Sequence, residues 1–574
     1  MRINFLGESS NQEEGAEVTV RIGGWWSGER LGRRLLGFFL VCAFALVAAI
    51  ATAEMAHAKQ QKSGSTKPNI VLIQVDDAVR SDIPYLPNVR NVIQQGGANF
   101  TNYNAPYPLC GPARASLLTG QLAHNNRMEG NFKASHGGHF VFRNMEGKLN
   151  QSNSLGPWMQ KAGYRTALIG KYLNEYGVAN QKEIPPGWNR WAALLDNSTY
   201  DYFNYGINVD GKIRYYGDEG YARDHIKLGT IGLARPQTSF AQLMKDFLAV
   251  YQPWDFFGTQ FYRKYSATVT GTLAVRFARN QSQHRKPFFL YYAPPQPHAE
   301  DANHLQGIRQ GAPGPDPRPS KQFRDTYDEE PLVRTPSFNE ADVSDKASNV
   351  SGLPLLTDED IARIEDNYRG RLGALRQVDN QVGRIVNVLK RKGEFKNTYF
   401  IFVSDNGYLQ GEHRLAASKF LPFENSVRIP AMISGPGIKA GRSVTRPAMD
   451  VDLTSTLLEI AGAKPGRTMD GISLLKAAKG KQSLPERDVP LEALRPLFEF
   501  STPITAYDVP YYGVKTNRYK YVNWSFGDKE LYDLKNDPDE MENLAGDPAM
   551  AGLLADLEAE ASRLRSCVGT SQCR

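Results

Sequence analysis

The chain has 574 residues, of which 41% are hydrophobic and 22% are charged. These fractions are typical of a folded globular protein and exclude an intrinsically disordered chain. The formal net charge is +7, which suits an anionic substrate or is a mild excess spread over a large surface, and we expect no nucleic-acid partner. The length predicts two to four domains, with a large single α/β domain as the known exception.

The N-terminal residues 1–58 have the features of an export signal. Three arginines precede an apolar run over residues 35–53, and two Ala-x-Ala sites lie at its end and just beyond it. This pattern predicts a cleaved signal peptide, with an uncleaved membrane anchor as the alternative because the run is about 19 residues long. Either way we expect the bulk of the chain outside the cytoplasm, as a periplasmic, secreted or membrane-anchored protein. Residues 59–67 are polar and predict a tether.

From Pro68 onward, short β-branched runs alternate with longer amphipathic stretches. Buried strands are predicted over residues 70–75, 288–292 and 399–403, and apolar residues at helical spacing predict a helix over 372–389. The alternation predicts an α/β fold in which helices sandwich a large, mixed, mainly parallel sheet. Functional loops then belong at the carboxyl ends of the strands.

The last part of the chain has a different pattern. Residues 485–574 are predicted to form a smaller α+β domain, an antiparallel sheet with a helix, on a main domain of residues 68–484. Its predicted strands and helix cover residues 511–515, 519–523, 530–534 and 553–564. Within the main domain, residues 301–357 are rich in Pro, Asp, Ser and Arg and predict a long surface excursion, a candidate lid over a substrate.

Four cysteines occur in the chain. Cys42 lies in the apolar N-terminal segment. Cys567 and Cys573 are six residues apart and predict a small disulfide in an oxidising compartment. Cys110 is then left without a partner, and an odd cysteine in an exported protein needs a role of its own.

Two acidic pairs each follow a predicted strand. Asp76 and Asp77 come after the first strand, and Asp405 and Asn406 come after the strand over 399–403. Each pair alone is as well explained by a helix cap or a solvated turn. Together they offer only oxygen donors, which select Ca²⁺ or Mg²⁺ over zinc or copper, and they predict a divalent-cation site beside Cys110.

Cys110 opens the run Cys110-Gly111-Pro112-Ala113-Arg114. Proline favours the first turn of a helix, so Cys110 is predicted at a helix N-terminus, where exposed N–H groups stabilise an anion. The alternative is a small buried apolar residue. A cysteine phosphatase is not supported, because its loop needs an arginine six residues after the cysteine and that position is Ser116 here.

Cys110-x-Pro112-x-Arg114, continuing to Gly120, resembles the signature of the type I sulfatases. A second family signature is matched over residues 163–171, and the family's ordered motifs extend the resemblance over about residues 68–545. It implies an alkaline-phosphatase-like fold with residues 68–484 as the catalytic domain. It also implies that a formylglycine-generating enzyme oxidises Cys110 to formylglycine during maturation.

The resemblance implies a role for each candidate residue. The hydrated aldehyde attacks the sulfur of a sulfate ester, and its second hydroxyl then ejects sulfate and restores the carbonyl. One divalent cation, Ca²⁺ in the first place and Mg²⁺ as the alternative, is held by Asp76, Asp77, Asp405, Asn406 and the modified Cys110. Arg114 would hold a gem-diol oxygen, Lys171 and Lys419 the sulfate oxygens, and His298 would protonate the departing alcohol.

One position departs from the family pattern. Many members read Gly-Lys-x-His, whereas Leu173 stands in the place of that histidine. The sequence around Lys171 instead resembles that of the N-acetylglucosamine-6-sulfatase and heparan endosulfatase branch, which implies a sulfated amino sugar or glycosaminoglycan as substrate. Asn174 and His413 are candidate substrate contacts. A phosphonate or phosphodiester hydrolase on the same fold and a catalytically silent carbohydrate-binding protein are the alternatives.

Overall fold

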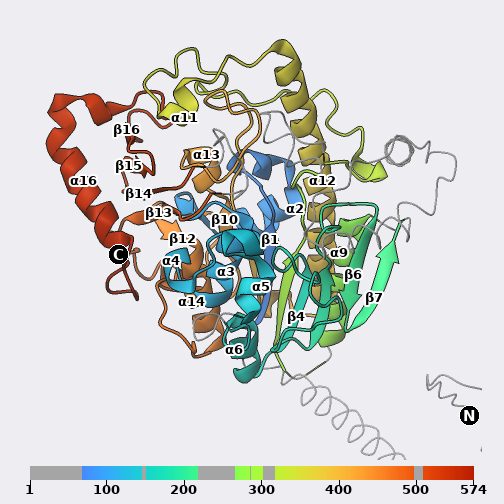
Figure 1. Ribbon diagram of the computed structural model, residues 1–574. Coiled ribbons are helices and arrows are strands. Elements are labelled where there is room, and N and C mark those ends of the chain that lie inside the picture. The colour runs from blue at the N-terminus through green and yellow to red at the C-terminus, as the bar shows by residue number, and fades with distance from the viewer. Residues whose placement is uncertain are drawn as a thin grey trace, which may run out of the picture. The chain divides into compact units, whose positions relative to one another are not determined.

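The computed structural model describes residues 67–144, 150–217, 265–282, 284, 286–300, 317–496 and 509–574 (Figure 1). The predicted signal or anchor and nearly all of the predicted tether lie outside these residues, as do residues 301–316 of the predicted lid. Ser65–Arg574 form one compact unit. Within the described ranges, every helix is too short or too polar to cross a lipid bilayer.

The described residues contain a mixed ten-stranded sheet, and its middle strands β9, β1, β8, β4 and β5 run parallel. Antiparallel neighbours extend it through β10 on one side and through β6 and β7 on the other. In spatial order the strands are β11 (Arg442–Val444), β2 (Ala98–Phe100), β10 (Ala431–Ser434), β9 (Thr398–Ser404), β1 (Asn69–Val75), β8 (Phe288–Ala293), β4 (Arg165–Gly170), β5 (Arg190–Leu194), β6 (Tyr205–Val209) and β7 (Lys212–Tyr216). The predicted mainly parallel sheet is therefore confirmed.

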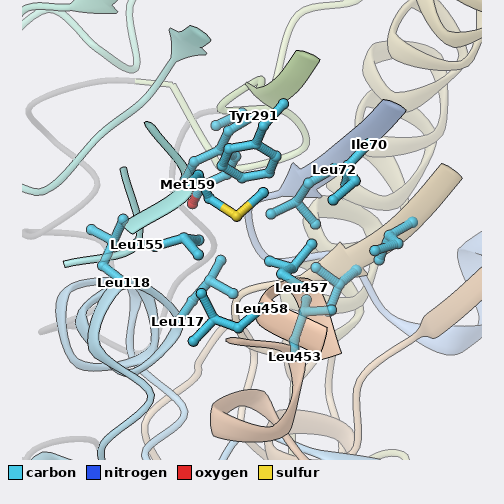
Figure 2. Close-up of a cluster of buried hydrophobic side chains, with 14 of the residues drawn as sticks. Ile70, Leu72, Leu117, Leu118, Leu155, Met159, Tyr291, Leu453, Leu457 and Leu458 are labelled. Atoms are coloured by element: carbon cyan, nitrogen blue, oxygen red, sulfur yellow. The ribbon is translucent and has the colours of Figure 1, made fainter. Parts of the chain in front are cut away.

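Helices cover both faces of this sheet (Figure 1). Ile70 and Leu72 of β1 pack against α3 (Cys110–Thr119), α6 (Leu155–Lys161) and α14 (Asp450–Ala461), while Val71 and Ile73 pack against α9 (Ser266–Gln281) and α12 (Asp358–Arg391) on the opposite face. Figure 2 shows the first of these clusters, in which leucines of α3 and α14 meet β1. The α-helices are α2 (Pro87–Val89), α3 (Cys110–Thr119), α4 (Ala123–Asn126), α5 (Gly138–Asn144), α6 (Leu155–Lys161), α9 (Ser266–Gln281), α11 (Ser348–Ser351), α12 (Asp358–Arg391), α13 (Glu424–Val427), α14 (Asp450–Ala461), α15 (Leu475–Ala478) and α16 (Ala551–Leu564).

The predicted helix over 372–389 is part of α12, which begins much earlier, at Asp358. Its first turns are mostly exposed, so they lack the apolar periodicity on which the prediction depended. The N-terminus is instead marked by Thr357, whose side chain accepts a hydrogen bond from the Asp360 N–H.

A separate four-stranded antiparallel sheet lies near the C-terminus, as predicted. Its strands are β13 (Val489–Ala493), β14 (Tyr511–Lys515), β15 (Tyr519–Trp524) and β16 (Lys529–Asp533). Helix α16 packs with these strands in one hydrophobic cluster. The predicted disulfide between Cys567 and Cys573 is present, and Cys110 is a buried free cysteine. A two-stranded sheet of β3 (Tyr103–Asn104) and β12 (Ala448–Met449) completes the described strands.

Candidate active site

The two acidic pairs lie side by side at the carboxyl ends of β1 and β9. Asp76 and Asp77 directly follow β1, Asp405 and Asn406 directly follow β9, and these strands are paired in parallel along their whole length. The backbone N–H of Asp77 donates to Asp405 Oδ1 at 3.2 Å, and Asn406 Nδ2 donates to Asp77 Oδ1 at 2.6 Å. All four side chains are buried. The strand-end placement expected for functional loops is therefore observed.

Cys110 is the first residue of α3, as predicted, and its helix faces the acidic pairs. Cys110 Sγ donates to Asp76 Oδ1 at 3.3 Å and accepts from Lys419 Nζ at 3.1 Å. Arg114 lies one helical turn later, so it shares the same face of α3. Its Nε donates to Asp405 Oδ2 at 2.9 Å and its Nη2 to Asp76 Oδ2 at 3.1 Å. Arg114 thereby joins the two acidic pairs.

Both candidate lysines reach the same carboxylates. Lys171 directly follows β4, and its Nζ lies 2.5 Å from Asp76 Oδ2. Lys419 Nζ donates to the two carboxylate oxygens of Asp77 at 2.6 and 2.9 Å. Lys171 and Lys419 are only 2% and 7% exposed. These are therefore buried ammonium groups and not the solvated surface charges that lysines usually are.

His298 reaches the cluster from the loop after β8. Its Nε2 lies 3.7 Å from Asp77 Oδ2, and its Nδ1 lies 2.7 Å from the carbonyl oxygen of Ala299. Since a carbonyl can only accept, Nδ1 carries the proton in the neutral imidazole and Nε2 faces the cluster as the acceptor. The ring stacks on Tyr200, with centroids 3.8 Å apart and an angle of 15° between the planes.

The cluster contains three buried carboxylates and three buried cationic side chains, namely Asp76, Asp77, Asp405, Arg114, Lys171 and Lys419. Burial alone would raise the pKa of Asp76, but the nearby charges of Lys171 and Arg114 hold it well below its usual value. Burial raises the pKa of the Cys110 thiol to about 12, and Asp76 adds to the rise. Burial, followed by the charge of Lys419, holds the pKa of His298 well below its usual value.

The oxygen donors of the cluster fit a hard divalent cation, whereas the Cys110 thiol and the His298 imidazole are softer donors. Asp76, Asp77, Cys110 and His298 each offer one ligand atom, and these atoms lie within 4.8 Å of one another. Asn406 Oδ1 is buried and has no hydrogen-bond partner among the described residues. A buried carbonyl oxygen without a partner is rare, and oxygen-rich sets favour Ca²⁺ or Mg²⁺. The residues present could therefore hold such an ion.

The two candidate substrate contacts lie in different surroundings. Asn174 is buried beside the cluster: its Nδ2 donates to the Tyr200 hydroxyl at 3.3 Å, and its Oδ1 has no partner in the described residues. His413 is also buried, but its Nδ1 lies 2.7 Å from Glu340 Oε2 and its ring stacks on Phe423 at 4.1 Å. The described part of the predicted lid, which includes Glu340, is thus held against the loop after β9.

Tyr200 and Arg371 belong to this region and carry no sequence motif. The Tyr200 hydroxyl accepts a hydrogen bond from Lys171 Nζ at 2.6 Å. Burial and the charge of Asp76 raise the pKa of Tyr200 well above its usual value, so the phenol stays protonated. Arg371, from α12, donates to the backbone carbonyl of Asp77 at 2.6 Å. Nothing in a single sequence separates Tyr200 from the rest of the 27 tyrosines.

Two models of known protein families match the sequence of this chain. A family model described as Sulfatase matches residues 68–463, and one described as N-sulphoglucosamine sulphohydrolase, C-terminal, matches residues 411–567. The first match covers more than half of the chain, and the protein therefore belongs to the sulfatase family of sulfuric ester hydrolases. The resemblance drawn from the motifs is confirmed.

Curated relatives carry sulfatase names. The human N-acetylglucosamine-6-sulfatase is 28% identical over 554 residues, which is 89% of this chain and 87% of the relative. The extracellular sulfatase SULF-1 homolog of Drosophila melanogaster is 30% identical over 71% of this chain, and its Caenorhabditis elegans counterpart is 29% identical over the same share. The matched regions make up only 31% and 48% of those two proteins.

Solved structures share the fold at low identity. One is described as bound to its substrate D-glucosamine-2-N,6-O-disulfate; it has a TM-score of 0.59 and 22% identity and covers 87% of this chain and 97% of its own. The phosphonate monoester hydrolase of Silicibacter pomeroyi has a TM-score of 0.61 and 22% identity and covers 88% of this chain and 96% of its own. At these identities the likeness concerns the fold, and function has to be argued from the site.

Proposed function

We propose that the protein hydrolyses sulfate monoesters, and that its substrate is a sulfated amino sugar or a glycosaminoglycan. The observation that carries the proposal is the gathering of Cys110, both acidic pairs, two buried lysines and His298 in one cluster at the strand ends. These residues lie far apart along the chain, yet the reaction needs all of them within reach of one sulfate group.

In this proposal Cys110 is converted to formylglycine by a formylglycine-generating enzyme, and its hydrated side chain supplies the oxygen that attacks sulfur. A divalent cation, Ca²⁺ or alternatively Mg²⁺, is held by Asp76, Asp77, Asp405, Asn406 and the modified Cys110. When bound, it supplies Lewis-acid polarisation and positive charge beside the transferred group.

The remaining side chains act on the substrate and on protons. Lys171 and Lys419 bind the sulfate oxygens, on which negative charge shifts as the ester S–O bond breaks. His298 takes up a proton from solvent at Nε2, the acceptor nitrogen of its neutral ring, and passes it to the departing alcohol oxygen. Arg114 holds a hydroxyl of the hydrated side chain while keeping the acidic pairs together. His298 Nε2, neutral again after that transfer, then takes the proton of the second hydroxyl, the carbonyl reforms, the C–O bond to the sulfo group breaks, and sulfate leaves.

The substrate class is supported by the names of the relatives and by the charge of the chain. The human relative is named an N-acetylglucosamine-6-sulfatase, and a net charge of +7 suits an anionic glycan. Asn174 is the better placed of the two candidate substrate contacts, because its Oδ1 has no partner among the described residues and can accept a hydrogen bond from a sugar hydroxyl or amide. His413 would act from the loop that it shares with Lys419.

Export completes the proposal. Cys567 and Cys573 are joined in a disulfide, and the N-terminal pattern is that of a signal peptide or membrane anchor. Both features support a protein that works outside the cytoplasm. Contact with a membrane would come only through an uncleaved N-terminal segment. We also propose the boundary near residue 485 between the catalytic domain and the smaller C-terminal domain.

Two measurements test the function. Digestion of the protein from its native host should yield a Cys110 peptide about 18 Da lighter than the unmodified thiol peptide, as expected when a thiol becomes an aldehyde. The intact enzyme should turn over an aryl sulfate, and Cys110→Ala should abolish that activity. An unmodified thiol in the active native protein would contradict the proposed nucleophile.

A phosphonate or phosphodiester hydrolase is the second candidate, since the phosphonate monoester hydrolase named above shares the fold. Turnover of 4-nitrophenyl sulfate should exceed that of bis(4-nitrophenyl) phosphate in the same preparation. A preference for the phosphodiester by orders of magnitude would replace the sulfatase assignment. If glycan binding persists and no ester is cleaved, the protein is the catalytically silent carbohydrate-binding form.

A further inference from the structure

Tyr200 makes contact with three of the residues to which the proposed reaction gives a role. Its ring lies flat against His298, its hydroxyl accepts from Lys171 Nζ at 2.6 Å, and Asn174 Nδ2 donates to the same hydroxyl at 3.3 Å. The Lys171 ammonium also lies 4.8 Å from the centroid of the ring.

The backbone around Tyr200 is held firmly to the segment after β4. The Asp196 N–H donates to the carbonyl oxygen of Tyr176 at 2.8 Å, and a carboxylate oxygen of Asp196 accepts from the Glu175 N–H. Two residues beyond Tyr200, the Tyr202 hydroxyl donates to the carbonyl oxygen of His298. Because the segment is tied at both ends, the ring is fixed in place and is not a mobile loop side chain.

Tyr200 supplies Lys171 with a polar contact that residue 173 does not supply. Leu173 is 2% exposed and lies in the hydrophobic core, where its side chain offers no polar atom to Lys171. Tyr200 brings a hydroxyl to Lys171 from a different segment, the one that follows β5, and brings an aromatic face to His298 at the same time. One side chain therefore contacts two groups from separate segments, those that follow β4 and β8.

We propose that Tyr200 is a positioning residue: its ring fixes the imidazole of His298 for proton transfer, and its hydroxyl fixes the ammonium of Lys171 for binding the transferred anion. The inference rests on the proposed function, because it assigns Tyr200 to the same reaction. The two halves of the side chain have separable effects, since the ring acts through the proton donor and the hydroxyl acts through the anion-binding lysine.

The test uses the full-length, matured enzyme and two aryl sulfates. Phenyl sulfate has a poor leaving group that needs protonation, and 4-nitrophenyl sulfate has a good leaving group that hardly does. In Tyr200→Leu, the ratio of kcat for phenyl sulfate to kcat for 4-nitrophenyl sulfate should fall about 10-fold, as a misplaced general acid requires. In Tyr200→Phe, kcat/KM should fall about 10-fold for both esters and the ratio should stay unchanged.

A double-mutant cycle separates positioning from general destabilisation. In a His298→Ala background, Tyr200→Leu should not lower the ratio further, because the group that it positions is already gone. Tyr164→Phe is the matched control: it removes another tyrosine hydroxyl, which donates to the Pro68 carbonyl oxygen at 2.8 Å, and should leave both rates unchanged. If Tyr200→Leu does not fold, Tyr200→Phe still tests the hydroxyl half.

The outcomes are distinct. An active wild-type enzyme whose leaving-group ratio is the same in Tyr200→Leu, or falls equally in the His298→Ala background, overturns the role of the ring. Unchanged kinetics in Tyr200→Phe overturn the role of the hydroxyl. A wild-type protein that carries the aldehyde and cleaves neither sulfate overturns the proposed function itself and this inference with it.

Discussion

Arg114 is the residue that holds the two acidic pairs together. It is fully buried, and its guanidinium donates hydrogen bonds to the carboxylates of Asp76 and Asp405, which follow two different strands. A guanidinium suits this position because its donors diverge in a fixed plane and can reach two oxygens at once. Its removal would leave two carboxylates in the protein interior with less compensation for their charge.

We expect Arg114→Met to lower the free energy of unfolding by about 3 kcal/mol, the cost of breaking a buried ion pair on one side. Urea unfolding followed by fluorescence measures the change. Arg363→Met is the control, since Arg363 and its partner Glu359 are exposed and such pairs contribute under about 1 kcal/mol. Equal losses in the two variants would contradict a structural role for Arg114.

Asn406 provides the second prediction at this scale. Its Oδ1, which has no partner within the described ranges, is proposed as a cation ligand, so chelation of the purified enzyme should lower Tm and added Ca²⁺ should restore it. At a Ca²⁺ concentration of about 100 Kd the ion should contribute about 2.7 kcal/mol to the unfolding free energy. Differential scanning calorimetry measures the shift, and Asn406→Leu should reduce it. A chelated protein with unchanged Tm would argue against a resident ion.

At the scale of elements, short helix α4 connects the segment after α3 to the C-terminal sheet. His124 of α4 places Nδ1 2.7 Å from Glu492 Oε2 of β13, and its Nε2 lies 2.9 Å from the carbonyl oxygen of Cys567. Burial alone would lower the pKa of His124, but the carboxylate of Glu492 raises it from 6.5 to about 9. The protonated imidazole therefore bonds to both partners.

The stability from this contact should depend on pH. Because the folded pKa lies above the unfolded value, the contribution is fully present below about pH 6.5 and is lost as pH rises through 9. The unfolding free energy of wild type should exceed that of His124→Gln by about 3 kcal/mol at pH 6 and by much less at pH 10. Urea titrations at both pH values measure this difference in unfolding free energy. If the difference were as large at pH 10 as at pH 6, His124 would not be the protonated group assigned here.

The elements were largely predictable from sequence, and so was the site. The strands before Asp76 and Asp405 are continuous apolar runs, and Pro112 marked the start of α3, so local pattern sufficed there. The first turns of α12, residues 358–363, escaped prediction because they are exposed or half-buried and mostly polar. Tyr200 escaped because its role arises from tertiary contacts alone, between segments that carry no shared spacing.

In the whole molecule, the C-terminal sheet is joined to the main sheet's helices and loops by buried charges. Lys515 of β14 donates to Asn104 Oδ1 at 2.8 Å, and Lys520 of β15 lies 2.9 Å from Glu424 Oε1 of α13. The disulfide loop adds a further contact, since the Gly569 N–H donates to Asp470 Oδ1 at 2.8 Å. Asp470 lies in the loop that follows α14 and also accepts from the Leu122 N–H.

Replacing both Cys567 and Cys573 with serine should lower the unfolding free energy by about 2 kcal/mol, as expected for a disulfide that closes a short loop. Guanidinium unfolding measures the loss. The wild-type protein should show a similar loss after reduction, whereas the double variant should be insensitive to reductant. If reductant destabilised the wild type and the double variant equally, the effect of reductant would not come from the Cys567–Cys573 disulfide.

The balance of three carboxylates against three ammonium and guanidinium groups has one more consequence. Their charges sum to zero, so the cluster by itself has little attraction for an incoming anion. A bound dication would leave the cluster with two uncompensated positive charges, enough to draw in a sulfate monoester. We therefore expect a compulsory binding order in which the metal enters first and the ester follows.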